Sequence, residues 1–381
     1  MPEIYFWQQI ISPHMAVLAA ALARQGARVT YVAQRTMSTE RARQGWQAPD
    51  LPGVDVRLAA TTADVQALVA QAPKEAMHVC QGIRGNGMVR VAQGALAARG
   101  CPFWVTMETV EDVGTRGLVK RAVYRWLFWR WRKHVQGVLA IGRNTPAWLA
   151  GLAVPAIKIF PFTYFLTDAV PALPAAEAGA GNPVSILFVG QLIERKRVDL
   201  LIAALASIAG AQRPFVLQII GAGPLDAALR AQAGEQLGQR VQWLGPLPMP
   251  EVRQRMAMAD CLVLPSRHDG WGAVVSEALM AGTPAICSDR CGAAEAVLAS
   301  GVGGVFQSGD QKALEALLAA HIAQGRQTVT KRAELAQWAR SLGAEAGARY
   351  LLDIFSCQDK EGVRPEPPWR RGSGATRDEA V

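Results

Sequence analysis

The sequence lacks a long apolar run. No stretch of about 18 uncharged apolar residues, the length that a membrane-spanning helix needs, occurs in its 381 positions. We therefore expect no transmembrane helix. No basic segment precedes the first apolar run, which argues against a secretory signal peptide. No internal repeat is present. These absences favour a cytoplasmic protein.

Cysteine is scarce as well. The six cysteines are spread along the chain, and most lie in apolar runs. Cys287 and Cys291 are four residues apart, but neither a second pair nor a nearby histidine completes a zinc site. We expect buried free thiols in a reducing compartment, with no bound metal and no cofactor.

Acidic residues are fewer than basic ones. The chain has 40 Lys and Arg against 31 Asp and Glu, a formal net charge of +9, which favours a phosphate-bearing ligand or an anionic membrane surface. Nucleic acid is the other partner that such a charge suggests, but no nucleic-acid-binding motif supports it. The length and the 50% of hydrophobic residues are enough for two domains with ordinary cores.

The stretch 260–289 organises the second half of the chain. Residues 262–264 are apolar and indicate a short buried strand, which Pro265 ends. A polar loop over 266–272 follows, and a helix is expected from about 273 to 281 before a second apolar run. A strand, a glycine-containing loop and a helix in this order place an anion at the helix N-terminus.

Two carboxylates mark this stretch, Asp269 in the loop and Glu277 in the expected helix. Spacing alone would carry no weight, but the surrounding residues resemble the pattern PS..EGfG...EA.a.GtPv of the retaining, GT-B glycosyltransferases called glycosyl transferases group 1, which include bacterial enzymes. The matching positions are Pro265-Ser266, Asp269-Gly270-Trp271-Gly272, Glu277-Ala278 and Gly282-Thr283-Pro284. The sequence departs from the family at Asp269, where the family usually has Glu.

The resemblance continues at the start of the second domain, where a strand over 185–190 precedes a basic segment. Arg195 and Lys196 fall where the family's diphosphate-binding cations lie, whereas Gln191 replaces a frequent arginine and Arg197 a glycine. Two cations beside a helix start are physically suited to a pyrophosphate, whose charge grows as the sugar leaves. Solvated surface charges are the alternative.

The strand 215–220 ends in a turn that contains Gly221 and Gly223. It fails as a dinucleotide fingerprint because Asp226 stands at the third glycine position, and it resembles the family's ivG.Gp motif instead. The segment from Trp243 to Pro246 resembles the turn whose backbone frames the nucleobase in relatives.

The resemblance implies a role for each site residue. Glu277 would accept hydrogen bonds from the ribose, Asp269 would bind hydroxyls of the donor sugar, and Arg195 and Lys196 would stabilise the leaving diphosphate. No side chain is an obvious nucleophile, and in the family the leaving phosphate is thought to act as the base. The residues expected around the nucleotide sugar are Gly190, Gly221, Gly223, Trp243, Gly245, Pro246, Gly270, Trp271, Gly272, Ala273, Val274, Glu277 and His14.

The first domain matches the family only in its order of elements. A strand, a helix and a strand over 4–32 imply a parallel right-handed crossover. His14 lies in the loop after the first strand, where it either contacts the ligand or simply starts a helix. Glu108 follows the strand 103–107 at the position where relatives have a histidine near the primary hydroxyl of the donor sugar. Either Glu108 takes that role or the role is absent.

The segment 118–135 contains six Lys or Arg and three Trp but no acid. This composition is typical of a helix that lies on an anionic membrane surface. The alternative is a helix half buried in its domain, with the basic residues in water.

We therefore predict two doubly wound α/β domains that face each other across a cleft. The first spans 1–167, a linker 168–184 follows, and the second spans 185–345. A helix at 346–356 should cross back to the first domain, and the tail 357–381 should be disordered.

The predicted activity is transfer of a hexosyl group from a nucleoside diphosphate sugar to a lipid-linked or glycan acceptor, with retained anomeric configuration, at the inner face of the cytoplasmic membrane. A sugar-nucleotide epimerase or hydrolase of the same architecture and a non-catalytic membrane adaptor remain as alternatives. The failed fingerprint disfavours a dinucleotide oxidoreductase.

Overall fold

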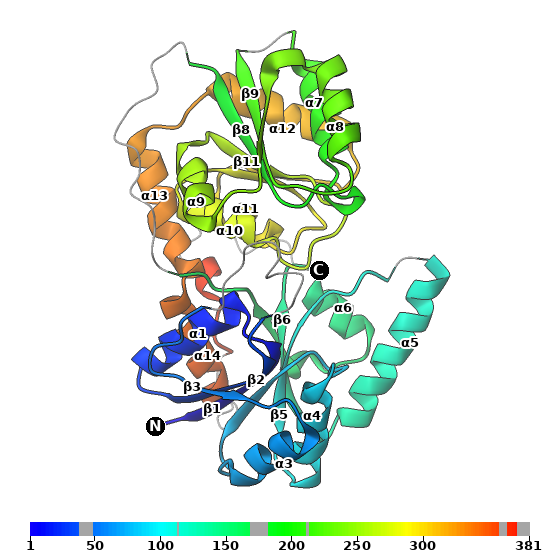
Figure 1. Ribbon diagram of the computed structural model, residues 1–381, viewed down its shortest axis with the longest axis vertical. Helices are drawn as coiled ribbons and strands as arrows, with labels where there is room; N and C mark the ends of the chain where they lie inside the picture. Colours follow the sequence, from blue (N-terminus) through cyan, green and yellow to red (C-terminus); the bar gives the residue numbers. More distant parts are fainter. Residues whose placement is uncertain (38–48, 113, 168–181, 211–212, 358–363, 372–381) are drawn as a thin grey trace. The chain divides into compact units, whose positions relative to one another are not determined.

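The computed structural model describes residues 1–37, 49–112, 114–167, 182–210, 213–357 and 364–371. The chain forms two compact units (Figure 1). Unit 1 consists of residues 1–168 and 342–368, and unit 2 of residues 169–341 and 369–381. Most of the expected linker lies outside the described residues.

Unit 1 is built on a parallel sheet with the strand order β3-β2-β1-β4-β5-β6-β7 (Figure 1). The order reverses between β1 and β4, the point at which open α/β sheets bind ligands. The strands are β1 (Glu3–Ile10), β2 (Arg28–Arg35), β3 (Asp55–Leu58), β4 (Met77–Gln81), β5 (Phe103–Glu108), β6 (Val135–Ile141) and β7 (Ile159–Phe162). The helices are α1 (Pro13–Arg24), α3 (Thr62–Gln71), α4 (Met88–Ala98), α5 (Gly114–Trp131), α6 (Thr145–Gly151) and α14 (Ala344–Ser356).

Local sequence explains how these elements form and pack. The side chain of Thr61 accepts a hydrogen bond from the Asp64 amide, and Asp64 accepts one from the Thr61 amide. This capping box starts α3. On β6, a Cβ atom at Gly137 would lie 2.3 Å from the ring of Trp104, so the buried indole packs directly on the glycine backbone.

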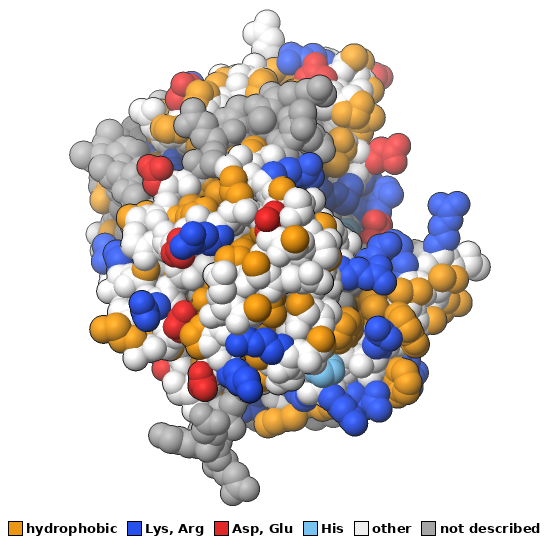
Figure 2. Space-filling model, turned by 60° about the horizontal axis from the view of Figure 1, so that its bottom comes forward, with side chains coloured by type: hydrophobic (Ala, Val, Ile, Leu, Met, Phe, Trp, Pro, Cys, Tyr) orange, Lys and Arg blue, Asp and Glu red, His pale blue; other side chains and the backbone are white. Residues whose placement is uncertain are grey.

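The helix α5 differs from its neighbours because much of it is exposed. One side packs on the core of unit 1 through Phe128 and the partly buried Tyr124 and Trp131. The other side leaves apolar side chains in water. Figure 2 shows apolar and basic side chains sharing the face on the right, where α5 lies. The most exposed apolar residues of this helix are Leu118 (69%), Val119 (66%), Val123 (45%), Trp126 (52%) and Trp129 (60%).

The helix α14 belongs to unit 1, where it packs along α1. Arg24 forms an ion pair of 2.7 Å with Glu345, and the hydroxyl of Tyr350 donates to the carbonyl of Pro161 at 2.9 Å. The chain enters unit 1 again at Leu342, so the expected boundary at 345 is a few residues too late.

The prediction of a disordered tail is wrong for residues 364–371. Arg364 stacks on Phe160 of unit 1, 4.7 Å from the ring centroid. Trp369 is fully buried, and Arg370 pairs with Glu295 of unit 2 at 2.5 Å. An indole and two guanidinium groups thus fix a segment whose charges and prolines resemble those of disordered tails.

Unit 2 is a second parallel sheet, with the order β10-β9-β8-β11-β12-β13. Both units are therefore doubly wound parallel sheets, as predicted. The strands are β8 (Val184–Val189), β9 (Phe215–Ile220), β10 (Val241–Gly245), β11 (Cys261–Leu264), β12 (Ala285–Ser288) and β13 (Gly304–Phe306). The helices are α7 (Val198–Ile208), α8 (Asp226–Gln236), α9 (Met249–Met258), α10 (Ala273–Met280), α11 (Ala294–Ser300), α12 (Gln311–Gln324) and α13 (Val329–Ala339).

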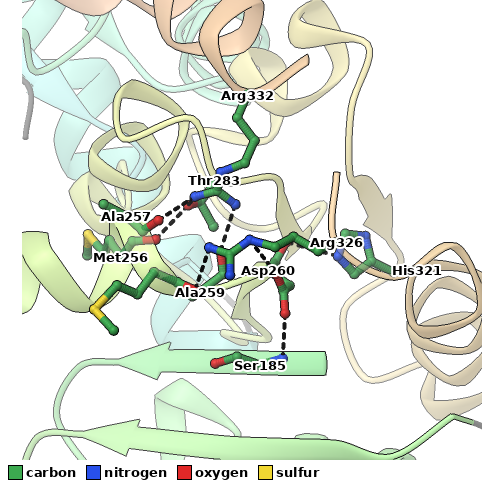
Figure 3. Close-up of polar contacts among 10 residues, drawn as sticks. Ser185, Met256, Ala257, Ala259, Asp260, Thr283, His321, Arg326 and Arg332 are labelled. Atoms are coloured by element: carbon green, nitrogen blue, oxygen red, sulfur yellow. Dashed lines mark hydrogen bonds and ion pairs between the residues drawn. The ribbon is translucent and has the colours of Figure 1, made fainter. Parts of the chain in front are cut away.

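A buried arginine fastens α10 at its C-terminal end (Figure 3). Arg332 of α13 is 3% exposed. It donates to the carbonyls of Ala259 at 2.8 Å and Ala257 at 2.6 Å, and to the hydroxyl of Thr283 at 2.9 Å. These acceptors lie at the end of α9 and just after α10, so one guanidinium joins three elements.

Asp260 extends this network to the sheet (Figure 3). Its carboxylate accepts a hydrogen bond from the Ser185 amide at 2.8 Å and lies 3.4 Å from Arg326. Its carbonyl lies 3.0 Å from His321 Nε2. The network stands where β8 and β11 begin, at the edge of the sheet opposite the loop of Asp269.

Candidate functional site

The loop between β11 and α10 lies at the carboxyl edge of the sheet in unit 2. Its last residue, Gly272, has φ 85°, a conformation that favours glycine. A Cβ atom there would lie 2.6 Å from the sulfur of Cys291 and 2.9 Å from the side chain of Leu264. The glycine therefore lets the loop pass between two neighbouring segments before α10 starts.

Residues 290–293 hold this loop from the side. The Asp269 amide donates to the Arg290 carbonyl, and the Gly292 amide donates to the Asp269 carbonyl, both at 3.0 Å. The Ala293 amide donates to the Trp271 carbonyl at 2.7 Å. A Cβ atom at Gly292 would lie 2.0 Å from the Gly270 carbonyl. The backbone position of Asp269 is thus fixed on both sides.

The side chain of Trp271 supports the loop from beneath. It is 2% exposed, and its Nε1 donates to the hydroxyl of Ser276 at 3.0 Å. The indole therefore belongs to the core of unit 2.

The two expected cations meet Asp269. Lys196 forms an ion pair with the Asp269 carboxylate, and Arg195 Nη1 lies 3.7 Å from the other carboxylate oxygen. Arg195 also donates to the carbonyl of His268 at 2.7 Å. The loops after β8 and β11 are therefore joined through charged side chains that are 73 positions apart in sequence.

Burial separates these charges from ordinary surface pairs. The side chains of Lys196 and Asp269 are 13% and 14% exposed, whereas Arg195 is 38% exposed. The next residue, Arg197, has φ 53°, in the left-handed region where the family has glycine. This residue therefore carries backbone strain.

Glu277 lies in the second turn of α10 and is half-buried. Burial raises the pKa of Glu277 above its ordinary value, and the positive charge of Arg253 partly opposes this shift. Within the described residues its carboxylate makes no hydrogen bond or ion pair. The helix starts at Ala273 and Val274 without a side-chain cap or an acid in the first turn.

The predicted glycines lie where the loops after neighbouring strands cross. A Cβ atom at Gly221 would lie 1.9 Å from the Gly190 carbonyl, and one at Gly223 would lie 2.4 Å from that of Leu192. The Gly221 amide donates to Gly245 at 2.9 Å. The backbones after β8, β9 and β10 thus approach closely at the carboxyl edge, as a backbone-lined ligand site requires.

Trp243 and Pro246 flank the end of β10. The guanidinium of Arg230 lies 4.6 Å from the centre of the Trp243 ring, and Pro246 is exposed. These residues, the glycines, the two cations and the start of α10 all belong to the carboxyl edge of one sheet.

His14 and Glu108 belong to unit 1. Glu108 lines a cavity of about 230 Å³ at the carboxyl ends of β1, β4 and β5. His14 lies in the first turn of α1, and its ring stacks on Tyr164, which also lines the cavity, at 5.0 Å. His14 is therefore both a helix-starting residue and a neighbour of the cavity wall.

Sequence reasoning missed several residues of this cavity. Gln8, at the end of β1, is 3% exposed, and its Nε2 has no hydrogen-bond partner in the described part of the chain. Tyr124 of α5 and Arg84 line the same cavity. A buried polar residue at the end of a central strand was the available signal for Gln8.

The described residues contain neither a membrane-spanning helix nor a metal-binding cluster. No helix there has the length and apolarity that crossing a membrane demands. No group of three or more His, Cys, Asp or Glu side chains in the same residues is arranged to hold a metal ion.

Comparison with known proteins identifies the family. Residues 172–341 match the family model "Glycosyl transferases group 1". The chain is 30% identical to the 2-deoxystreptamine glucosyltransferase of Streptomyces kanamyceticus over 71% of each protein. It is 28% identical to the phosphatidyl-myo-inositol mannosyltransferase of Mycobacterium leprae, over 71% of this chain and 67% of the relative.

Solved structures show the same fold. The lipopolysaccharide outer core galactosyltransferase WaaB in its apo form has a TM-score of 0.69 and 16% identity, with 93% of this chain and 99% of that chain covered. Anabaena Alr3699/HepE in complex with UDP and glucose has a TM-score of 0.66 and 17% identity, with 93% and 100% covered. The predicted GT-B fold class is thereby confirmed, and the chain belongs to the group 1 glycosyltransferases.

Proposed function

We propose that this glycosyltransferase moves a hexosyl group from a nucleoside diphosphate sugar to a hydroxyl of a lipid-linked saccharide, with retained anomeric configuration. The observation that carries the proposal is the cluster at the carboxyl edge of unit 2. There two cations, the uncapped start of α10 and an acidic residue of that helix lie beside closely approaching glycine backbones.

Each part of the cluster has a task in this reaction. Lys196 and Arg195 stabilise the diphosphate, whose negative charge grows as the bond to the sugar breaks. The amides at Ala273 and Val274 point the positive end of a helix toward the same charge. Glu277 accepts hydrogen bonds from the ribose, and Asp269 accepts them from hydroxyls of the donor sugar.

In this proposal, unit 1 binds the acceptor. Its cavity of about 230 Å³ is smaller than the 300–1,000 Å³ of pockets for drug-sized ligands, which suits a single ring. Glu108, which the resemblance assigns to the donor sugar, can accept a hydrogen bond from a sugar hydroxyl but cannot donate one while ionised. A relative that is named for phosphatidyl-myo-inositol supports an acceptor that is attached to lipid.

The helix α5 supports contact with an anionic membrane surface. It carries no acid, and guanidinium groups lie beside its exposed tryptophans. Arg130 lies 5.8 Å from the Trp126 ring and Arg132 lies 4.7 Å from the Trp129 ring. The burial of Phe128 fits the alternative of a half-buried helix, and the exposure of Trp126 is what supports the proposed membrane contact. We place the enzyme in the cytoplasm, peripherally bound at the inner membrane face.

Nucleotide release tests the proposal. The protein is incubated with UDP- and GDP-linked hexoses, with and without a lipid extract of bacterial membranes, and the free nucleotide is measured. Release that requires both a donor and the extract supports the transferase. Equal release without the extract would favour the epimerase or hydrolase, and no release with any donor would favour the adaptor.

A further inference from the structure

The contact between Asp269 and the two cations gives this carboxylate a second role. Its Oδ2 pairs with Lys196 and its Oδ1 lies 3.7 Å from Arg195. The same nitrogen atoms are the donors that a diphosphate would use at this site. A carboxylate and a phosphate oxygen are both anionic acceptors of charge-assisted hydrogen bonds, so Asp269 and the diphosphate draw on the same cations.

The surrounding structure holds the pair in place. Hydrogen bonds to Arg290 and Gly292 fix the backbone of Asp269, and the hydroxyl of Ser266 lies 3.4 Å from its Oδ2. The side chain of Lys196 passes beside Gly190, where a Cβ atom would lie 3.8 Å from Lys196 Cε. Because both partners are about 13–14% exposed, water screens their attraction less than it screens a surface pair.

We propose that Asp269 competes with the diphosphate for Lys196 and Arg195 and thereby promotes release of the nucleoside diphosphate product. This inference rests on the proposed function and adds to the contact of Asp269 with the donor sugar. When the sugar has left, the Asp269 carboxylate keeps its contacts to the two cations, so it lowers the positive potential that holds the product. No covalent bond or proton transfer is involved.

Inorganic pyrophosphate is the probe that isolates this competition, since it contains neither the sugar nor the base. Its affinity is measured by calorimetry for the wild-type protein and for Asp269→Asn, which keeps the shape of the side chain and removes its charge. We expect Asp269→Asn to bind pyrophosphate at least tenfold more tightly. Equal or weaker binding would overturn the proposal.

Asp226→Asn is the matched control. Asp226 also pairs with an arginine of unit 2, Arg230 at 2.7 Å, but it lies outside the cation pair. This variant should bind pyrophosphate within about twofold of wild type. A tenfold gain in the control as well would show a general effect of net charge and would contradict a specific competition.

A double-mutant cycle tests whether the effect passes through Lys196. In a Lys196→Met background, Asp269→Asn should improve pyrophosphate binding by less than about threefold. A tenfold gain in pyrophosphate affinity in the Lys196→Met background would show that the effect of Asp269 does not depend on Lys196. Damage to the fold cannot imitate the expected result, because it lowers affinity; Asp269→Ala provides a second variant if the amide form is unstable.

The outcomes separate this inference from the proposed function. If wild type binds pyrophosphate and Asp269→Asn binds it no better, the competition is refuted while the donor site stands. If wild type binds neither pyrophosphate nor any nucleoside diphosphate, both the donor site and the competition are refuted.

Discussion

At the scale of the residue, the carboxylates Asp269 and Glu277 have opposite environments although they lie eight positions apart. Asp269 pairs with two cations. Glu277 has no ion pair within the described residues, and burial raises its pKa. The charge of Asp269 is thus compensated by ion pairs, whereas no described residue forms an ion pair with Glu277.

Glu277→Ala should weaken nucleoside diphosphate binding. Hydrogen bonds to a charged acceptor contribute about 1.5–3 kcal/mol, so the dissociation constant should rise roughly 10- to 150-fold at 1.4 kcal/mol per decade. Calorimetry with UDP and GDP measures this change. Because the assigned contact is to the ribose, binding of inorganic pyrophosphate to the variant should stay near wild type; an equal loss for pyrophosphate would contradict the ribose assignment.

The raised pKa of Glu277 predicts a pH-dependent stability. The folded state holds the proton more tightly than the unfolded state, so the stability associated with this group is present below the ordinary glutamate pKa of about 4.3. It is lost as the pH rises through the higher folded value. Glu277→Gln should therefore unfold at higher denaturant concentration than wild type at pH 7 and at a similar concentration near pH 4. A variant that is less stable than wild type at pH 7 would contradict this sign.

The pairing of Asp269 with Lys196 could not be predicted from the sequence. The motif assigns one residue to the sugar and the other to the phosphate, and only the meeting of two loops 73 positions apart brings them together. The burial of Trp271 was equally hidden, because the bond from its indole to Ser276 depends on how α10 follows the loop.

At the scale of the element, the strand, loop and helix of 260–289 followed from the sequence. The apolar run ended by proline indicates the strand, the two glycines indicate the loop, and the glycine after the helix marks its end. The helix at 118–135 was harder to delimit: α5 starts at Gly114 and ends at Trp131, and Val135 already lies in β6. Its basic residues gave no signal for either boundary.

Changing Arg125, Arg130, Arg132 and Lys133 to Gln should weaken binding of the protein to anionic vesicles. Each cation near such a surface contributes about 1 kcal/mol, so loss of four should lower the partition coefficient about a thousandfold. Co-sedimentation with phosphatidylglycerol-containing vesicles measures the effect.

The control for α5 changes four exposed cations elsewhere to Gln, which are Arg28, Arg90, Lys331 and Arg340. This variant has the same net charge, so its vesicle binding should stay much closer to wild type. Equal binding by the α5 variant and wild type, or binding that is indifferent to anionic lipid, would refute the assigned membrane face.

The hydrogen bonds of Arg332 near the end of α10 give another prediction at this scale. Arg332→Met removes a buried guanidinium and leaves the carbonyls of Ala257 and Ala259 without their donor. A buried polar group without a partner costs about 1–3 kcal/mol, so the free energy of unfolding should fall by about 3 kcal/mol in urea denaturation. Lys331→Met, at the exposed neighbouring position, should change it by less than about 0.5 kcal/mol. A similarly small change for Arg332→Met would refute the stabilising role assigned to Arg332.

At the scale of the whole molecule, the sequence predicted two doubly wound units because motifs and strand periodicity agreed. It failed where long-range contacts decide, at the re-entry into unit 1 at Leu342 and at the buried Trp369. The glycine-containing turns at the carboxyl edge of unit 2 were predictable from the sequence, because few other residues allow backbones to approach so closely. The cavity in unit 1 was not, since its polar residues come from separate strands and from α5.

The most direct test of the account is transfer of a labelled hexose. The protein is given a UDP- or GDP-hexose labelled in the sugar, together with a bacterial lipid extract, and the organic-phase product is examined by NMR. We expect the label to enter the lipid fraction with the same anomeric configuration as the donor, and Lys196→Ala to reduce the rate at least a hundredfold. Label that enters only water, or a lipid product with inverted configuration, would contradict the account.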